Sequence, residues 1–192
     1  MKEFSKGKIV FLGDSEVGKT AIINSYNQMD ISNLLPTVAA NSIKATVDID
    51  GKEVILNLWD TAGQENYQCL LPLYVRRAHV GVIVFSLASL ESYQNIEKWI
   101  QIFREQSECQ IIIVGNKNDL PHKVDIDKVN EELTSKNYPF FQTSAKLGDG
   151  IELLFQEIAK IVAQDEIGGK GETTPFLPET NTQPQGRNGC CS

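Results

Sequence analysis

The chain of 192 residues is poor in cysteine and has no long hydrophobic run. Its longest apolar stretch, Val80 to Phe85, has the length of a strand and falls far short of the roughly 18 residues that span a membrane. The first residues, Met1 to Lys6, lack the apolar run of a signal peptide. Cys69 and Cys109 stand alone, so the four cysteines do not indicate a disulfide framework. We therefore expect a cytosolic, reduced protein.

Positive charge is also scarce. The chain has 18 Lys and Arg against 25 Asp and Glu, a formal net charge of −7. Proteins that bind nucleic acid present a basic stripe, so we expect no nucleic-acid partner. Hydrophobic content of 41% and charged content of 22% are ordinary for a globular protein, and the length suits one domain with a tail. Any affinity for phosphate must come from a local site.

Such a site is predicted by Gly13–Thr20, which has the form G-x-x-x-x-G-K-T. A strand is expected before it, at Lys8–Leu12, and a helix after it, from Ala21. In this context, loop N–H groups and the helix N-terminus point at an anion, and Lys19 adds a positive charge. The hydroxyl of Thr20 suits a Mg²⁺ bound to the phosphates. The residues predicted to bind nucleotide here are Ser15, Glu16, Val17, Gly18, Lys19, Thr20 and Ala21.

Further along the chain, apolar runs of strand length alternate with amphipathic stretches of helical period. Strands are expected at 8–12, 42–49, 53–59, 80–85, 110–114 and 138–142. One helix is expected to begin at 21, and a separate short helix is expected to end near 77. Further helices are expected at 91–106, 124–136 and 150–163. Asp50-Gly51 predicts a hairpin and therefore one antiparallel pair. The alternation predicts an α/β fold, a mostly parallel sheet with helices on both faces, in which ligands gather at the carboxyl ends of strands.

Three further polar motifs follow expected strands. In the first, Asp60 can hold Mg²⁺ through a water, the N–H of Gly63 can reach a γ-phosphate, and Gln64 can orient an attacking water. The second contains Asn116, Lys117 and Asp119. The third, Thr143–Lys146, includes the nucleotide-binding candidates Ser144, Ala145 and Lys146.

The second and third motifs favour guanine. The carboxylate of Asp119 can accept from both the N1–H and the 2-amino group, whereas adenine has no 2-amino group. Lys117 can lay its stem along the purine, and a backbone N–H near Ala145 can donate to O6. The base contact would therefore select GTP and GDP over ATP.

With these motifs in place, the chain resembles the small GTPases of the Ras superfamily and, within them, the Rab family, over roughly residues 6 to 165. The resemblance implies a P-loop G domain at 1–167, with a six-stranded mostly parallel sheet, one antiparallel strand pair and about five helices, and a flexible tail at 168–192. It also implies a slow GTPase, stimulated by an activating protein, in which Gln64 is catalytic. The implied Mg²⁺ ligands are Thr20, Thr37 and Asp60.

The ending Cys190-Cys191-Ser192 is similar to the paired cysteines on which Rab proteins carry two geranylgeranyl groups. The charged side chains of the tail cancel, so it lacks a polybasic second signal, and a single lipid would anchor it only marginally. The resemblance implies cycling between the cytosol and the cytoplasmic face of vesicle or endosomal membranes. The implied partners are an exchange factor, an activating protein, a GDP-dissociation inhibitor, a Rab escort protein and effectors.

The chain departs from the family pattern at several positions. Thr37–Ser42 reads T-V-A-A-N-S, so Ala39 replaces a glycine and Ser42 an aromatic, which affects effector recognition. Ile31 stands where the family places an aromatic beside guanine, and we expect faster nucleotide exchange. Glu16 places a carboxylate on the phosphate loop, and Asn66 replaces the basic residue after Gln64-Glu65.

Two alternatives remain open. The first is a nucleotide-dependent kinase or ATPase with the same phosphate loop, against which Asp119 argues. The second is a GTP-binding module with impaired or absent hydrolysis, which the altered sequence after Thr37 favours and the set Thr37, Asp60 and Gln64 disfavours.

Overall fold

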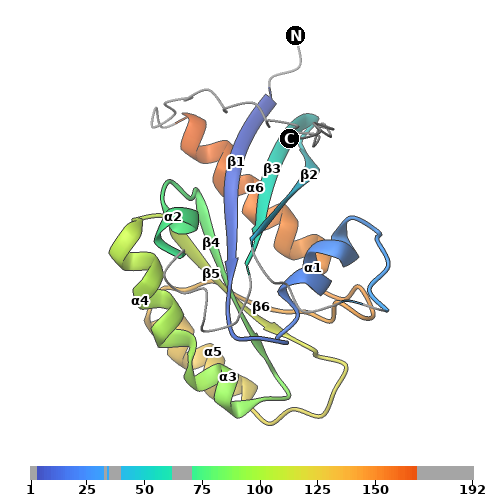
Figure 1. The fold of residues 1–192 in the computed structure, drawn as a ribbon, viewed down its shortest axis with the longest axis vertical. Coiled ribbons are helices and arrows are strands. Elements are labelled where there is room, and N and C mark those ends of the chain that lie inside the picture. Colours follow the sequence, from blue (N-terminus) through green and yellow to red (C-terminus); the bar gives the residue numbers. More distant parts are fainter. Residues whose placement is uncertain (1–3, 33, 35–39, 62–70, 168–192) are drawn as a thin grey trace, which may run out of the picture.

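The computed structural model describes residues 4–32, 34, 40–61 and 71–167. Within them, six strands form one sheet in the order β2-β3-β1-β4-β5-β6 (Figure 1). The strands are β1 (Phe4–Leu12), β2 (Asn41–Ile49), β3 (Lys52–Asp60), β4 (Val80–Ser86), β5 (Gln110–Asn116) and β6 (Phe140–Gln142). The helices are α1 (Lys19–Tyr26), α2 (Leu71–Val75), α3 (Leu90–Gln94), α4 (Ile96–Gln106), α5 (Ile126–Ser135) and α6 (Ile151–Ile167).

The predicted hairpin joins β2 to β3, and this pair is antiparallel, whereas β3, β1, β4, β5 and β6 run parallel to one another. Asp50 and Gly51 both have positive φ, 52° and 79°, as a two-residue type I′ connection requires. The carboxylate of Asp48 also accepts from the Gly51 N–H at 3.0 Å. The predicted mixed sheet with a single antiparallel pair is therefore confirmed.

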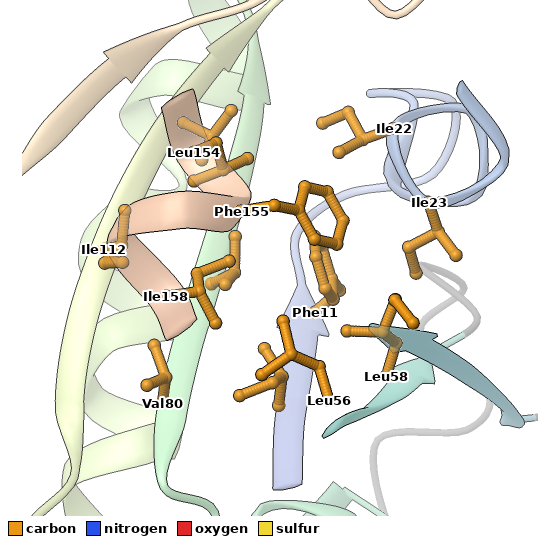
Figure 2. Close-up of a cluster of buried hydrophobic side chains, with 14 of the residues drawn as sticks. Phe11, Ile22, Ile23, Leu56, Leu58, Val80, Ile112, Leu154, Phe155 and Ile158 are labelled. Atoms are coloured by element: carbon orange, nitrogen blue, oxygen red, sulfur yellow. The ribbon is translucent and has the colours of Figure 1, made fainter. Parts of the chain in front are cut away.

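Alternate residues of each central strand face opposite layers of helices. In β1, Ile9 and Phe11 pack with α1 and α6, whereas Val10 and Leu12 pack with α2, α4 and α5. Figure 1 shows the two layers, with α1 and α6 on one side of the sheet and the other helices on the opposite side. Figure 2 shows the first layer, where the ring of Phe155 lies against Phe11 between α6 and β1. Strands buried on both faces explain why β4 and β5 are almost continuously apolar.

The long helix predicted for residues 91–106 is interrupted. α3 ends at Gln94 and α4 begins at Ile96, so Asn95 terminates one helix and precedes the next. The apolar face of α4 packs in the core, since Trp99 and Phe103 are buried in the second layer. The first helix also begins earlier than predicted, at Lys19.

All five parallel strands end at the same edge of the sheet, since they share one direction. β1 lies between β3 and β4, so the chain leaves it in the middle of the sheet, where the strand order reverses. Open α/β sheets bind ligands at this position. None of the described helices is both long and apolar enough to cross a membrane.

Candidate nucleotide-binding site

The loop between β1 and α1 approaches its neighbours too closely to admit side chains at two glycines. Gly13 has φ 143°, and a Cβ there would lie 2.1 Å from the backbone oxygen of Val84. Gly18 has φ 102°, and a Cβ there would lie 2.2 Å from the Asn116 side-chain nitrogen. Both positions therefore require glycine, because the backbone angle and the available space exclude other residues.

Lys19 begins α1 and is 5% exposed. Its Nζ donates to the backbone oxygens of Gly13 at 2.8 Å and Asp14 at 2.7 Å, so the ammonium spans the loop. Burial lowers the pKa of Lys19 from 10.5 to about 8, although the carboxylates of Asp60 and Asp14 oppose this shift. The Lys19 ammonium is therefore buried and fixed by two backbone oxygens, in a position where its charge could stabilise an anion bound in the loop.

The other residues of the loop differ in exposure. Ser15 and Glu16 are exposed, whereas Val17 is buried and Ala21 is half-buried. Glu16 has φ 62°, an angle that residues with a Cβ adopt uncommonly. Its side chain is exposed, so this carboxylate can remain in solvent.

Two of the three residues predicted to hold Mg²⁺ lie together. The hydroxyl of Thr20, in the first turn of α1, donates to Oδ2 of Asp60, the last residue of β3, at 2.6 Å. Carboxylate and hydroxyl oxygens are the hard ligands that Mg²⁺ takes in proteins, so this donor set fits the ion. The neighbouring Thr61 donates to the backbone oxygen of Phe11 at 2.7 Å and fixes the end of β3 against β1.

Asn116, at the end of β5, joins the loop to the third motif. Its Nδ2 donates to the backbone oxygen of Val17 at 2.9 Å. Its Oδ1 accepts from the Thr143 hydroxyl and from the Ala145 N–H, both at 3.2 Å. Asn116 is 1% exposed, so all three bonds lie in the interior. One carboxamide therefore holds together segments that are far apart in the sequence.

The residues expected to recognise the base also meet. The Ser144 hydroxyl donates to Oδ1 of Asp119 at 2.7 Å. This bond is the largest cause of a lowered pKa at Asp119, and the charges of Lys146 and Lys117 act in the same direction. Lys117 has φ 64°, and Lys146 is exposed. Asp119 is therefore held as a carboxylate that can accept two hydrogen bonds.

Several predicted residues lie outside the described ones, namely Thr37, Ala39, Gly63, Gln64, Asn66, Cys190 and Cys191. Ile31 is described and is half-buried. Ser42 is the register partner of Trp59 on the neighbouring strand.

Sequence reasoning missed a second set of contacts on the phosphate loop. The ring of Trp99 is buried in the core, and its indole N–H donates to Asp14 at 2.8 Å. The side chain of Asn95 donates to the same carboxylate at 2.7 Å. The available signal was chemical, because a buried indole N–H usually has a hydrogen-bond partner. Spacing alone did not indicate which residue this partner is.

The fold and the site together define a phosphate-loop nucleotide-binding domain of the G-domain type. The Ras family model matches residues 8–164. The chain is 33% identical to Ras-related protein Rab-17 of Mus musculus, over 96% of this chain and 90% of that protein. It is 32% identical to Ras-related protein Rab-11A of Dictyostelium discoideum, over 96% of this chain and 94% of that protein. The chain therefore belongs to the Ras family and is a Rab-type small GTPase.

Proposed function

We propose that the protein is a molecular switch that binds GTP, hydrolyses it to GDP and recruits effectors in its GTP-bound form to regulate vesicular membrane trafficking. The observation that carries this proposal is the bonding of Asn116 to both Val17 and Ala145. Through it, the loop that would bind phosphate and the loops that would bind the base form one connected site. Membership of the Ras family and similarity to two Ras-related Rab proteins support the same function.

Guanine is the base that this site would select. Asp119, held as a carboxylate by Ser144, would accept from N1–H and the 2-amino group. A backbone N–H of the segment Ser144–Lys146 would donate to O6, and Lys117 would cover the purine face. Adenine would leave Asp119 facing an acceptor at N1, which costs the site at least one buried hydrogen bond.

The phosphates would lie in the loop against Lys19 and the N–H groups of Ser15 to Ala21. Mg²⁺ would be held by Thr20, Asp60 and Thr37, and it supplies charge stabilisation for phosphoryl transfer when bound. Gln64 would orient the attacking water, and the N–H of Gly63 would reach the γ-phosphate. Hydrolysis would release the segments around Thr37 and Gly63 and so end effector binding. A slow intrinsic rate and stimulation by an activating protein complete the proposal.

At the membrane, Cys190 and Cys191 would each carry a geranylgeranyl group. Two lipids suffice for stable anchoring where one does not. The protein would then cycle between the cytosol and the cytoplasmic face of vesicle or endosomal membranes. Its partners would be an escort protein, a GDP-dissociation inhibitor, an exchange factor, an activating protein and effectors.

A second candidate function is a GTP-binding module with impaired or absent hydrolysis. The specific observation in its favour is Ser42, which faces Trp59 across the β2–β3 ladder where the family has an aromatic residue. A changed surface beside the switch segment is compatible with a protein that holds nucleotide without cycling.

Single-turnover hydrolysis of GTP by purified protein with Mg²⁺, compared with Gln64→Leu, tests the proposal. We expect slow hydrolysis that falls at least about tenfold in the variant, because the water loses its positioning group. Tight GTP binding without hydrolysis in either protein would favour the second candidate. Displacement of bound GTP by ATP at equal concentration would contradict guanine selection altogether.

A further inference from the structure

The carboxylate of Asp14, the second residue of the phosphate loop, accepts hydrogen bonds from two side chains at the start of α4. Oδ1 accepts from the indole N–H of Trp99 at 2.8 Å, and Oδ2 accepts from the side chain of Asn95 at 2.7 Å. Both oxygens are therefore engaged by donors more than 80 positions later in the chain. Hydrogen bonds to a charged acceptor are about twice as strong as those between neutral groups.

The backbone of the same residue is bonded to the site. The Asp14 backbone oxygen accepts from Lys19 Nζ at 2.7 Å, beside the bond from Lys19 to Gly13. Its charge also opposes the lowering of the Lys19 pKa. Asp14 thus connects α4 on one side with the lysine of the phosphate loop on the other.

The two donors are placed by the break between α3 and α4. Asn95 precedes the first residue of α4, but its side chain makes no capping bond to that helix. It donates to Asp14 instead. Trp99 lies one turn further along and is 3% exposed, so its indole ring is fixed by packing in the second core layer. The indole N–H of Trp99 is therefore a rigidly held donor to Asp14 of the phosphate loop.

An open pocket of about 600 Å³ lies beside these bonds, and Asp14, Asn95 and Trp99 line it together with Glu16, Glu91 and Lys98. The two bonds to Asp14 therefore connect the loop to α4 at the wall of this pocket.

We propose that Asp14 is a positioning residue for nucleotide binding, and that its bonds to Trp99 and Asn95 hold the phosphate loop and Lys19 in the geometry that receives phosphate. This proposal rests on the proposed function, since it assigns a role within the same site. Asp14 acts through the loop backbone and through Lys19, and its carboxylate, turned toward α4, has no role in contacting the nucleotide.

The negative charge of Asp14 could affect nucleotide binding in a second way, which an experiment can distinguish from positioning. A carboxylate near bound phosphates is repulsive, so removing it would tighten nucleotide binding if charge were its main effect. If positioning dominates, removing the hydrogen bonds weakens binding. Asp14→Asn separates the two effects, because it removes the charge while the amide still accepts from Trp99, and the Asn95 amide can rotate to accept from it.

The test is the dissociation rate of a fluorescent GDP analogue from the purified, nucleotide-loaded full chain with Mg²⁺. We expect Trp99→Phe to raise the rate by about tenfold, which corresponds to one lost hydrogen bond to a carboxylate, and Asp14→Ala, which loses two, to raise it by at least as much. The double variant should dissociate no faster than Asp14→Ala alone, and Asp14→Asn should recover most of the loss. Ile100→Val, a buried change on the same helix, is the matched control and should leave the rate unchanged.

A second readout follows the bond itself. The indole ¹⁵N–¹H resonance of Trp99 should move in Asp14→Ala and stay close to its wild-type position in Ile100→Val. A wild-type rate in Trp99→Phe, or an equal acceleration in Ile100→Val, would overturn the positioning role. Slower dissociation in Asp14→Ala and Asp14→Asn alike would assign the effect to charge and would overturn it too. A wild-type protein that retains no GDP would instead refute the proposed function, and with it this role.

Discussion

The side-chain nitrogen of Asn116 lies 2.9 Å from the backbone oxygen of Val17, although 99 positions separate them in the chain. The same nitrogen occupies the space that a Cβ at Gly18 would need. The end of β5 and the phosphate loop therefore determine each other's shape. The bond gives Asn116 a structural role in the candidate phosphate site, although its side chain would not itself contact phosphate.

Asn116→Ala should weaken GDP binding by at least about tenfold and lower the free energy of unfolding by about 2–6 kcal/mol. The change leaves the Ala145 N–H and the Val17 oxygen without this buried partner, and each such loss costs about 1–3 kcal/mol. Equilibrium urea unfolding and titration with a fluorescent GDP analogue measure the two effects. Asn118→Ala, an exposed neighbour, is the control and should change neither.

Lys19 should make GDP binding depend on pH. Its pKa is about 8 in the ligand-free protein, against 10.5 in the unfolded chain, and bound phosphates would raise it. Below pH 8 the ammonium is already present, so affinity should be constant. Above pH 8 binding must take up a proton, and the dissociation constant should rise by up to about tenfold per pH unit.

The stability of the ligand-free protein should change with pH in the opposite direction to its affinity for GDP. Between pH 8 and 10.5 the unfolded chain binds more protons than the ligand-free native state, so stability without nucleotide should rise with pH in this window.

Titrations with the GDP analogue in EDTA from pH 7 to 9.5 measure the affinity for GDP. A dissociation constant that stays flat across this range would show that Lys19 keeps its proton.

Asp119→Asn should exchange the base preference of the site. The amide offers a donor and an acceptor where the carboxylate offers two acceptors, so it suits xanthine, which carries a carbonyl in place of the 2-amino group. We expect GDP affinity to fall at least about a hundredfold and xanthosine diphosphate to bind more tightly than GDP. Competition titrations compare the two nucleotides. Asp127→Asn, an exposed change in the first turn of α5, should leave the preference unchanged.

Ile31→Phe should slow GDP dissociation by about two- to tenfold. An aromatic ring against the edge of the guanine contributes roughly 0.5–1.5 kcal/mol more than its buried area alone. Ile31 is half-buried, so part of its side chain can be reached by a ligand. Met29→Phe adds the same ring at an exposed site nearby and should not slow release. Dissociation of Ile31→Phe at the wild-type rate or faster would refute the expectation.

The sequence alone predicted the layers of this protein well. Apolar runs such as Val80 to Phe85 have no polar face, and their short length and β-branched residues favour a strand buried between two helical layers. Asp50-Gly51 likewise predicted the hairpin, because positive φ at two successive positions is a local requirement. Signals of this kind depend on neighbours in the chain, so they can be interpreted without coordinates.

The break at Asn95 was not predicted, and the start of α1 was placed two residues late. The apolar face formed by Ile96, Trp99 and Phe103 lies wholly in α4, so its helical period gave no signal of an interruption at Asn95. The side-chain amide of Asn95 donates a hydrogen bond to Asp14, which is far away in the sequence. The local periodicity of the sequence cannot indicate a contact of this kind.

The sequence by itself determined which chemical groups this protein carries and at which strand ends they lie, because motif spacing and apolar period are local properties of the chain. Only the tertiary structure decided how those groups are held. The bonds from Asn116 to Val17, from Ser144 to Asp119 and from Trp99 to Asp14 each join distant segments. Their geometry follows from the packing of the sheet against its helices, which depends on every strand at once.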